Sequence, residues 1–299
     1  MKNTILGSTG IQVSQLGMGL AEIGSAPFGI DEARGLLNSA LDAGITFLDS
    51  AACYGASEEL LGKTIADRRS EFILATKCGH ITGDYSGQEW SRQTVTDSID
   101  RSLTRLKTDY LDLVQLHSCE TAILQSGEAI EALIRAKEAG KTRFIGYSGD
   151  NEAAEWAVNS DIFSTLQTSF SLVEQKARRH LLGLAKSKGM GIIIKRPIGN
   201  GVWGAKVPPS EYSREYYERA QAMKKEGNWM DEEADPIKLA LAFTFSHPEV
   251  DTAIVGTRNL AHLLSNIRML EESIGLSPAT KIELHRRFDK LGANWHQLT

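Results

Sequence analysis

Cysteine is scarce in this 299-residue sequence, which contains only three. An odd number of cysteines without a Cys-x-x-Cys spacing argues against a disulfide framework. Because disulfides are rare in reducing compartments, we expect the protein to be cytoplasmic. The first seven residues, Met1 to Gly7, lack the apolar run of a secretory signal and agree with that expectation.

Long apolar runs and blocks of like charge are missing as well. No stretch approaches the roughly 18 apolar residues that a membrane-spanning helix needs, so we expect no membrane association. Acidic residues (38) outnumber basic ones (33), which gives a net charge of -5. Nucleic-acid binding needs a clustered basic surface, so a small molecule is the expected partner. No pattern in the sequence indicates an oligomeric state.

The sequence does contain eight short apolar runs separated by amphipathic stretches. Several runs, such as Gly191–Ile194, are almost wholly apolar, a pattern typical of strands that are covered on both faces. We expect strands at residues 13–19, 45–49, 72–77, 111–116, 143–147, 165–168, 191–195 and 252–255.

The stretches between these runs have the features of helices. Residues 31–42 begin with Asp31 as the expected N-cap, and residues 91–107 carry apolar residues at helical spacing. Residues 126–139 begin with a serine and end before Gly140. Alternating strands and helices indicate a parallel sheet.

Eight strand–helix units without a change of composition favour a closed (β/α)8 TIM barrel, formed by residues 1–299 as one domain. An open dinucleotide-binding sheet would carry Gly-x-Gly-x-x-Gly after its first strand, and Gly17-Met18-Gly19 lacks that continuation. Outside the repeat we expect an N-terminal β-hairpin over residues 3–12, turning at Ser8-Thr9-Gly10. We also expect an added C-terminal helix over residues 277–290.

Polar residues after the second, third and fourth apolar runs suggest acid–base chemistry. Asp49 and Lys77 end the second and third runs, His117 directly follows the fourth, and Tyr54 lies in the turn after Asp49. Barrel enzymes place their reacting groups at this end of the strands. Carbonyl reduction requires a hydride and a proton delivered to oxygen. Because a phenol is a poor acid at neutral pH until a cation stabilises its anion, we expect Tyr54 to need Lys77, held by Asp49. His117 would fix the carbonyl oxygen.

Longer segments around these residues resemble the aldo-keto reductases. Residues 47–58 are similar to the family signature around its Asp and Tyr, Ala75–Lys77 to the catalytic lysine segment, and residues 101–117 to a second signature. The resemblance runs from the hairpin to the C-terminal helix. It implies reversible reduction of an aldehyde or ketone to an alcohol, with Tyr54 as proton donor. It also implies NADPH as cofactor, with NADH as a second possibility, bound across the barrel mouth.

The resemblance further implies a set of cofactor contacts. Ser148 and Gln167 would hold the carboxamide, and residues 197–201 would wrap the pyrophosphate. Arg258, beside a helix start, suits the 2′-phosphate of NADPH, and Asn266 would face the adenine. The implied cofactor-binding residues are Gly19, Ser148, Gln167, Lys195, Arg196, Pro197, Ile198, Gly199, Asn200, Gly256, Thr257, Arg258, His262 and Asn266.

The sequence departs from the family pattern at three places. Gly149 stands where the family usually has Asn, which removes one carboxamide contact. Lys195-Arg196 stands where an aromatic residue often stacks on the nicotinamide, so either residue is a candidate to cover the ring. His262 stands where members often have Arg near the phosphate, and this substitution weakens the expected preference for NADPH.

Two other functions remain open from the sequence. The first is a regulatory subunit that senses nicotinamide state and turns over slowly, since relatives with such roles keep the same residues. The second is a thiol or zinc enzyme on the same barrel, because Cys53, Cys78 and Cys119 follow the second, third and fourth strands, close to Tyr54, Lys77 and His117. Cysteine at a tight rim also replaces Ala or Ser without chemistry, and we predict no metal site.

Overall fold

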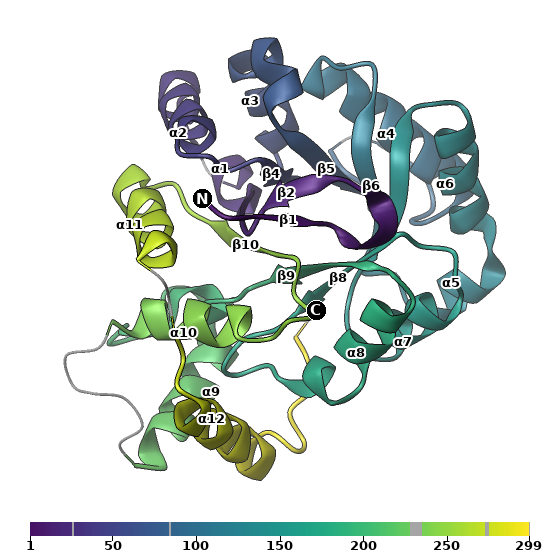
Figure 1. Cartoon of the computed structure of the whole chain (residues 1–299). Helices are drawn as coiled ribbons and strands as arrows, with labels where there is room; N and C mark the ends of the chain where they lie inside the picture. Colours follow the sequence, from purple (N-terminus) through teal and green to yellow (C-terminus); the bar gives the residue numbers. More distant parts are fainter. Residues whose placement is uncertain (26, 84, 228–234, 273–274, 299) are drawn as a thin grey trace.

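Eight parallel strands form a closed barrel in the computed structural model, which describes residues 1–25, 27–83, 85–227, 235–272 and 275–298 (Figure 1). Sequential strands are neighbours, and β10 closes the barrel by pairing with both β9 and β3. This topology confirms the predicted (β/α)8 barrel. The strands are β1 Asn3–Ile5, β2 Gln12–Ser14, β3 Leu16–Gly19, β4 Phe47–Asp49, β5 Ile73–Cys78, β6 Leu111–His117, β7 Thr142–Ser148, β8 Thr165–Ser169, β9 Gly191–Lys195 and β10 Thr252–Gly256.

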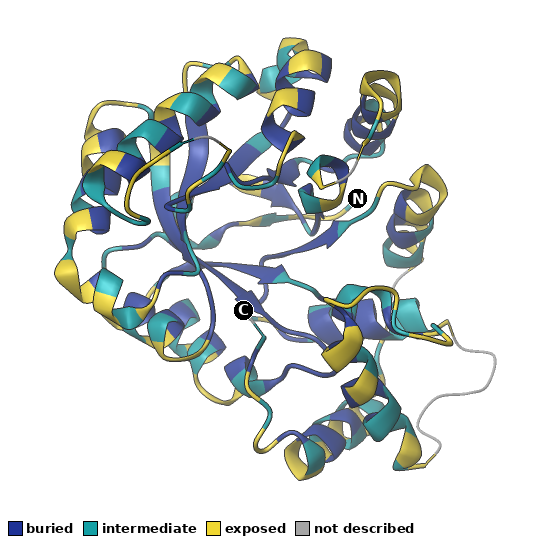
Figure 2. Cartoon of the chain, turned by 180° about the vertical axis from the view of Figure 1, so that it is seen from behind, coloured by how far each residue is buried: buried dark blue, intermediate teal, exposed yellow. Residues whose placement is uncertain are grey.

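Helices cover the outside of the barrel. Buried residues lie along the strands and on the inner helix faces, whereas exposed residues lie on the outer helix faces (Figure 2). No helix among the described residues is long and apolar enough to cross a lipid bilayer. The helices are α1 Ala21–Gly24, α2 Ile30–Asp42, α3 Ser57–Thr64, α4 Arg92–Leu106, α5 Thr121–Ser126, α6 Glu128–Glu138, α7 Asn151–Asn159, α8 Leu181–Ser187, α9 Arg214–Lys225, α10 Pro236–Phe245, α11 Leu260–Glu271 and α12 Pro278–Leu291.

The antiparallel pair β1–β2 is the expected N-terminal hairpin and lies across the end of the barrel where the strands begin (Figure 1). Leu6 is fully buried within it and packs in the same apolar cluster as Phe47 and Ile193 of the barrel. Gly7 has a φ of +52°, and a Cβ there would lie 2.2 Å from the backbone nitrogen of Gly191. This close approach closes the barrel at the end where the strands begin and leaves the opposite end open.

Three expected boundaries are wrong. The run 13–19 divides into β2 and β3, because Gln15 turns its carbonyl oxygen to the amide of Ala253. The helix expected over 126–139 begins instead at α6, because Gly127, in the left-handed region at φ 75°, ends α5. Asp31 lies inside α2, whose N-cap is Gly29.

Candidate active site

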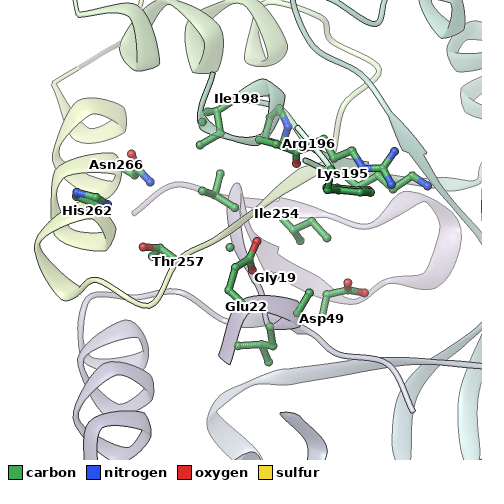
Figure 3. Close-up of a pocket in the computed structure, with 18 of the residues that line it drawn as sticks. Gly19, Glu22, Asp49, Lys195, Arg196, Ile198, Ile254, Thr257, His262 and Asn266 are labelled. Atoms are coloured by element: carbon green, nitrogen blue, oxygen red, sulfur yellow. The ribbon is translucent and has the colours of Figure 1, made fainter. Parts of the chain in front are cut away.

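A cavity of about 960 Å³ opens at the end of the barrel where the parallel strands finish. Figure 3 shows its long axis, with His262 and Asn266 of α11 at one end and Asp49, Lys195 and Arg196 at the other. The predicted site residues that line it are Gly19, Asp49, Tyr54, His117, Ser148, Gln167, Lys195, Arg196, Pro197, Ile198, Asn200, Gly256, Thr257, His262 and Asn266.

Asp49, at one end of the cavity, forms a buried ion pair with Lys77. Lys77 Nζ donates to Asp49 Oδ2 at 2.5 Å and to the carbonyl oxygen of Ser50 at 2.9 Å, and both side chains are only 1% exposed. The second carboxylate oxygen, Oδ1, accepts from the amide of Gln167 at 2.9 Å and from that of Gln115 at 3.3 Å. Both charges are therefore hydrogen-bonded in several directions, which fixes the ammonium group in place.

The ammonium group of Lys77 lies beneath Tyr54, with Nζ 4.7 Å from the centroid of the phenol ring. Burial would lower the pKa of Lys77, but the Asp49 carboxylate and the Tyr54 hydroxyl outweigh that effect and raise it. The pKa of Tyr54 lies above its ordinary value, because burial outweighs the attraction of Lys77 for a phenolate. At neutral pH the site therefore holds a protonated phenol above a charged lysine.

His117 faces Tyr54 with the ring centroids 5.7 Å apart and the planes at 80°. Burial, followed by the charges of Lys77 and His80, holds the pKa of His117 well below its usual value, so the ring is neutral at pH 7. Trp90 Nε1 donates to the His117 carbonyl oxygen at 3.1 Å, and Cys53 Sγ lies 3.3 Å from Nδ1. These contacts fix a neutral imidazole at the cavity wall.

Ser148 and Gln167, the residues expected at the carboxamide, are joined to the ion pair. Ser148 Oγ donates to Gln167 Oε1 at 2.9 Å, and the Gln167 amide donates onward to Asp49. Both side chains are buried and border the cavity. The structure thus brings them within reach of a molecule bound beside Tyr54.

The charged groups of Lys195 and Arg196 are held by the protein. Lys195 Nζ pairs with the buried carboxylate of Asp150 at 2.9 Å. The Arg196 guanidinium donates to Tyr216 Oη at 3.0 Å and to the carbonyl oxygen of Leu298. Although burial opposes ionisation of Asp150, Lys195 and the neighbouring hydrogen bonds hold the pKa of that carboxyl below its usual range.

Three predicted residues do not border the cavity. Lys77 lies behind Tyr54, and Gly199, at φ +57°, shapes the turn between the lining residues Ile198 and Asn200. Arg258 turns its guanidinium to the carbonyl oxygen of Pro27 at 2.8 Å and over the Phe28 ring. Arg258 therefore lies at the rim, next to Thr257.

Three residues of the cavity region were not predicted from the sequence. Glu22 of α1 points toward Gly256, where an added Cβ would lie 1.9 Å from its carboxylate, and it stands between the two ends of the cavity (Figure 3). Partial burial raises the pKa of Glu22. Tyr212 lines the cavity, and Asp150 supports Lys195 from below. None of these positions lies within residues 47–58, 75–77 or 101–117, although Asp150 directly follows the departure at Gly149.

The three cysteines do not resemble a metal or thiolate site. Burial raises the pKa of all three thiols, to about 12 for Cys119. Among the described residues, no group of three or more His, Cys, Asp or Glu side chains is arranged to hold a metal ion. Protonated thiols are poor nucleophiles, so the geometry gives the thiol and zinc hypotheses no support.

Comparison with known proteins gives consistent matches. The model of the aldo/keto reductase family matches residues 15–283. An L-galactose dehydrogenase of Arabidopsis thaliana is 31% identical, over 93% of this chain and 92% of its own length. The uncharacterized oxidoreductase YqkF of Bacillus subtilis is 29% identical, over 96% and 99%. The solved holo form of aldo-keto reductase AKR11C1 from Bacillus halodurans has a similar fold, with a TM-score of 0.84, 24% identity and 96% coverage of both chains.

Proposed function

Because the chain belongs to the aldo/keto reductase family, we propose that it reduces an aldehyde or ketone to an alcohol with a nicotinamide cofactor, preferentially NADPH. The observation that carries this proposal is the position of Tyr54, with the buried Asp49–Lys77 pair beneath its ring and His117 beside it. This set combines a proton donor, a fixed cation and a neutral hydrogen-bonding ring at one end of a cavity.

In the proposed mechanism, Tyr54 gives its hydroxyl proton to the carbonyl oxygen. Lys77 stabilises the phenolate that results, and Asp49 keeps Lys77 charged and in position. His117, being neutral, orients the carbonyl oxygen without competing as an acid. When bound, the nicotinamide cofactor supplies the hydride. Because the pKa of Tyr54 is raised, the donor form is present at neutral pH, and alcohol oxidation should need alkaline conditions.

The residues present fit a dinucleotide in the cavity. Nδ2 of Asn200 is buried in the lining and has no hydrogen-bond partner among the described residues, so it can donate to a ligand. Ser148 and Gln167 would hold the nicotinamide end beside Tyr54. Residues 197–201 and Thr257 would meet the phosphates, and Asn266 and His262 would meet the adenosine end. Lys195 and Arg196 would contribute their stems, since their charged ends are already paired.

Tyr54→Phe tests the proposed acid. Loss of general acid catalysis should reduce turnover by about 10²- to 10⁴-fold, while binding of NADPH, followed by tryptophan fluorescence, should stay close to that of the wild type. Reduction should be measured with a panel of aldehydes and ketones, and the reverse reaction with L-galactose and the oxidised cofactor, because one relative is an L-galactose dehydrogenase. Tyr110→Phe, on the surface, is the matched control. Near-normal turnover in Tyr54→Phe would refute the acid assignment.

Arg258→Ala tests the preference for NADPH. Arg258 lies at the rim, and its guanidinium would have to leave the Pro27 carbonyl oxygen to meet the 2′-phosphate. Loss of that charge-assisted contact should weaken NADPH binding by roughly tenfold and leave NADH binding almost unchanged. Arg268→Ala, exposed on the helix α11 that follows Arg258, is the control. Equal weakening of both cofactors would exclude Arg258 from the phosphate site. Tight cofactor binding without turnover of any carbonyl would instead favour the sensing role.

A further inference from the structure

Cys53 directly precedes Tyr54 in the sequence, and its thiol contacts His117, another residue of the proposed site. Its Sγ lies 3.3 Å from Nδ1 of His117, so the loop after β4 and the end of β6 meet through this pair. Cys53 does not border the cavity, whereas His117 does. The thiol therefore approaches the imidazole from behind, on the edge that carries Nδ1.

A neutral imidazole has one nitrogen that donates and one that accepts. The charge states favour a neutral pair, because burial raises the pKa of Cys53 and lowers that of His117. The other contacts of His117 do not select a tautomer. Trp90 donates to its backbone carbonyl oxygen, and the His80 ring meets it edge-on at 4.9 Å between centroids while its own Nδ1 faces Glu89.

The direction of the hydrogen bond follows from donor and acceptor strength. A protonated thiol has a hydrogen to donate, and an unprotonated imidazole nitrogen is a better acceptor than a thiol sulfur, which accepts only weakly. On the cavity side, a carbonyl oxygen can only accept, so the ring must present an N–H there. Both requirements are met when Nδ1 accepts from Cys53 and Nε2 carries the proton.

We propose that Cys53 is a positioning residue, whose thiol donates to His117 Nδ1 and so holds the imidazole in the tautomer with its proton on Nε2. The N–H group then faces the substrate carbonyl oxygen. This inference rests on the proposed carbonyl reduction for its purpose, but the tautomer itself is a property of the protein without substrate. Cys53 acts through His117 and does not touch the reacting atoms.

The direct test is nitrogen NMR of the chain labelled with ¹⁵N-histidine, with the His117 signals identified by their loss in His117→Asn. In the wild type we expect a protonated Nε2 and an unprotonated Nδ1. Cys53→Ala should shift the His117 tautomer ratio toward Nδ1–H by about 3- to 10-fold, the range expected for loss of one neutral hydrogen bond. Cys53→Ser keeps a donor and should restore the wild-type ratio. Cys119→Ala is a matched loss of a buried thiol and should leave it unchanged.

A wild-type ring protonated on Nδ1, or on both nitrogens as in a thiolate–imidazolium pair, would overturn the proposal. An unchanged tautomer ratio in folded Cys53→Ala would also overturn it. In kinetics, kcat/KM should fall by about 3- to 10-fold in Cys53→Ala and recover in Cys53→Ser. If the protein reduces no carbonyl, the NMR result still decides the tautomer, so failure of the proposed function and failure of this inference are separable.

Discussion

At the level of single residues, the packing around Gly149 explains why this chain lacks the Asn that the family usually has at this position. A Cβ at this position would lie 2.4 Å from the hydroxyl of Tyr147 and 2.6–2.7 Å from its ring. Tyr147 is fully buried and donates to the carbonyl oxygen of Cys119 at 2.8 Å, so it cannot move aside without losing that bond. The absence of Asn at this position is therefore explained by Tyr147, because the space beside its ring does not accommodate a Cβ atom.

Gly149→Ala should lower the free energy of unfolding by about 1–3 kcal/mol, the usual cost of forcing atoms into a packed core. Urea unfolding followed by tryptophan fluorescence would measure it. Gly183→Ala is the matched control, because Gly183 is exposed in α8 with no atom within 4 Å of an added Cβ. Helix propensity predicts that this control gains up to about 1 kcal/mol. Equal effects of the two substitutions would show that the Tyr147 contact is not limiting.

At the scale of the element, two histidines join the end of α10 to the C-terminal helix α12. His247 Nε2 and His285 Nε2 lie 3.1 Å apart, and His247 Nδ1 contacts the carbonyl oxygen of Phe243 at 2.8 Å. Since that carbonyl only accepts, His247 Nδ1 is the donor, and the proton shared between the rings belongs to His285. Burial lowers the pKa of both rings to about 4.

This pair should make folding stability depend on pH between about 6.5 and 4. The folded pKa values lie below the unfolded value near 6.5, so the unfolded chain binds more protons in that window and stability falls as the pH falls. Glu174, whose pKa burial raises to about 7, acts in the opposite direction. Comparing the pH dependence of stability in a histidine variant with that of the wild type therefore cancels the contribution of Glu174 and isolates that of the histidines.

His285→Gln keeps an amide donor for His247 but removes one titrating ring. Compared with the wild type, its unfolding free energy should change less steeply between pH 6.5 and 4, because the variant takes up about one proton fewer when it unfolds. Urea midpoints at half-unit pH intervals would show this. His296→Gln, on the exposed side of the C-terminal segment, should follow the wild-type curve. If His285→Gln also follows it, the pair does not titrate as the geometry implies.

At the scale of the whole molecule, the C-terminal segment returns to the barrel mouth, near the strands in Figure 2. The amide of the buried Gln297 donates to Asp150 Oδ1 and to the carbonyl oxygen of Ser169, both at 3.0 Å, and its Oε1 accepts from the amide of Ala177. Leu298 receives Arg196 on its carbonyl oxygen and donates its amide to Glu174 at 2.7 Å. The end of the chain thus holds the residues beneath Lys195 and Arg196.

Gln297→Ala should reduce the free energy of unfolding by about 1–3 kcal/mol, because it leaves buried polar partners unsatisfied. Thermal unfolding and the NADPH dissociation constant should be measured together. Since Asp150 fixes Lys195 at the cavity wall, cofactor binding should weaken as well. His296→Ala alters the adjacent exposed residue and should leave both measurements close to those of the wild type. A stable Gln297→Ala protein would show that the tail only rests on the barrel.

The barrel, the hairpin, the C-terminal helix and the family could all be predicted from the amino-acid sequence, because hydrophobic periodicity and long ordered motifs report on the local backbone and on strand ends. The sequence could also place Asp49, Tyr54 and His117 at one rim, since parallel strands finish at one end of a barrel. Tertiary structure alone decided the partners: Asp150 for Lys195, Glu22 against Gly256, Tyr147 against Gly149 and Cys53 behind His117. These contacts join segments that are brought together only when the barrel closes, or depend on a side-chain rotamer. No local pattern encodes such a distance, and so the sequence could name the candidate reacting groups but not the contacts that hold them.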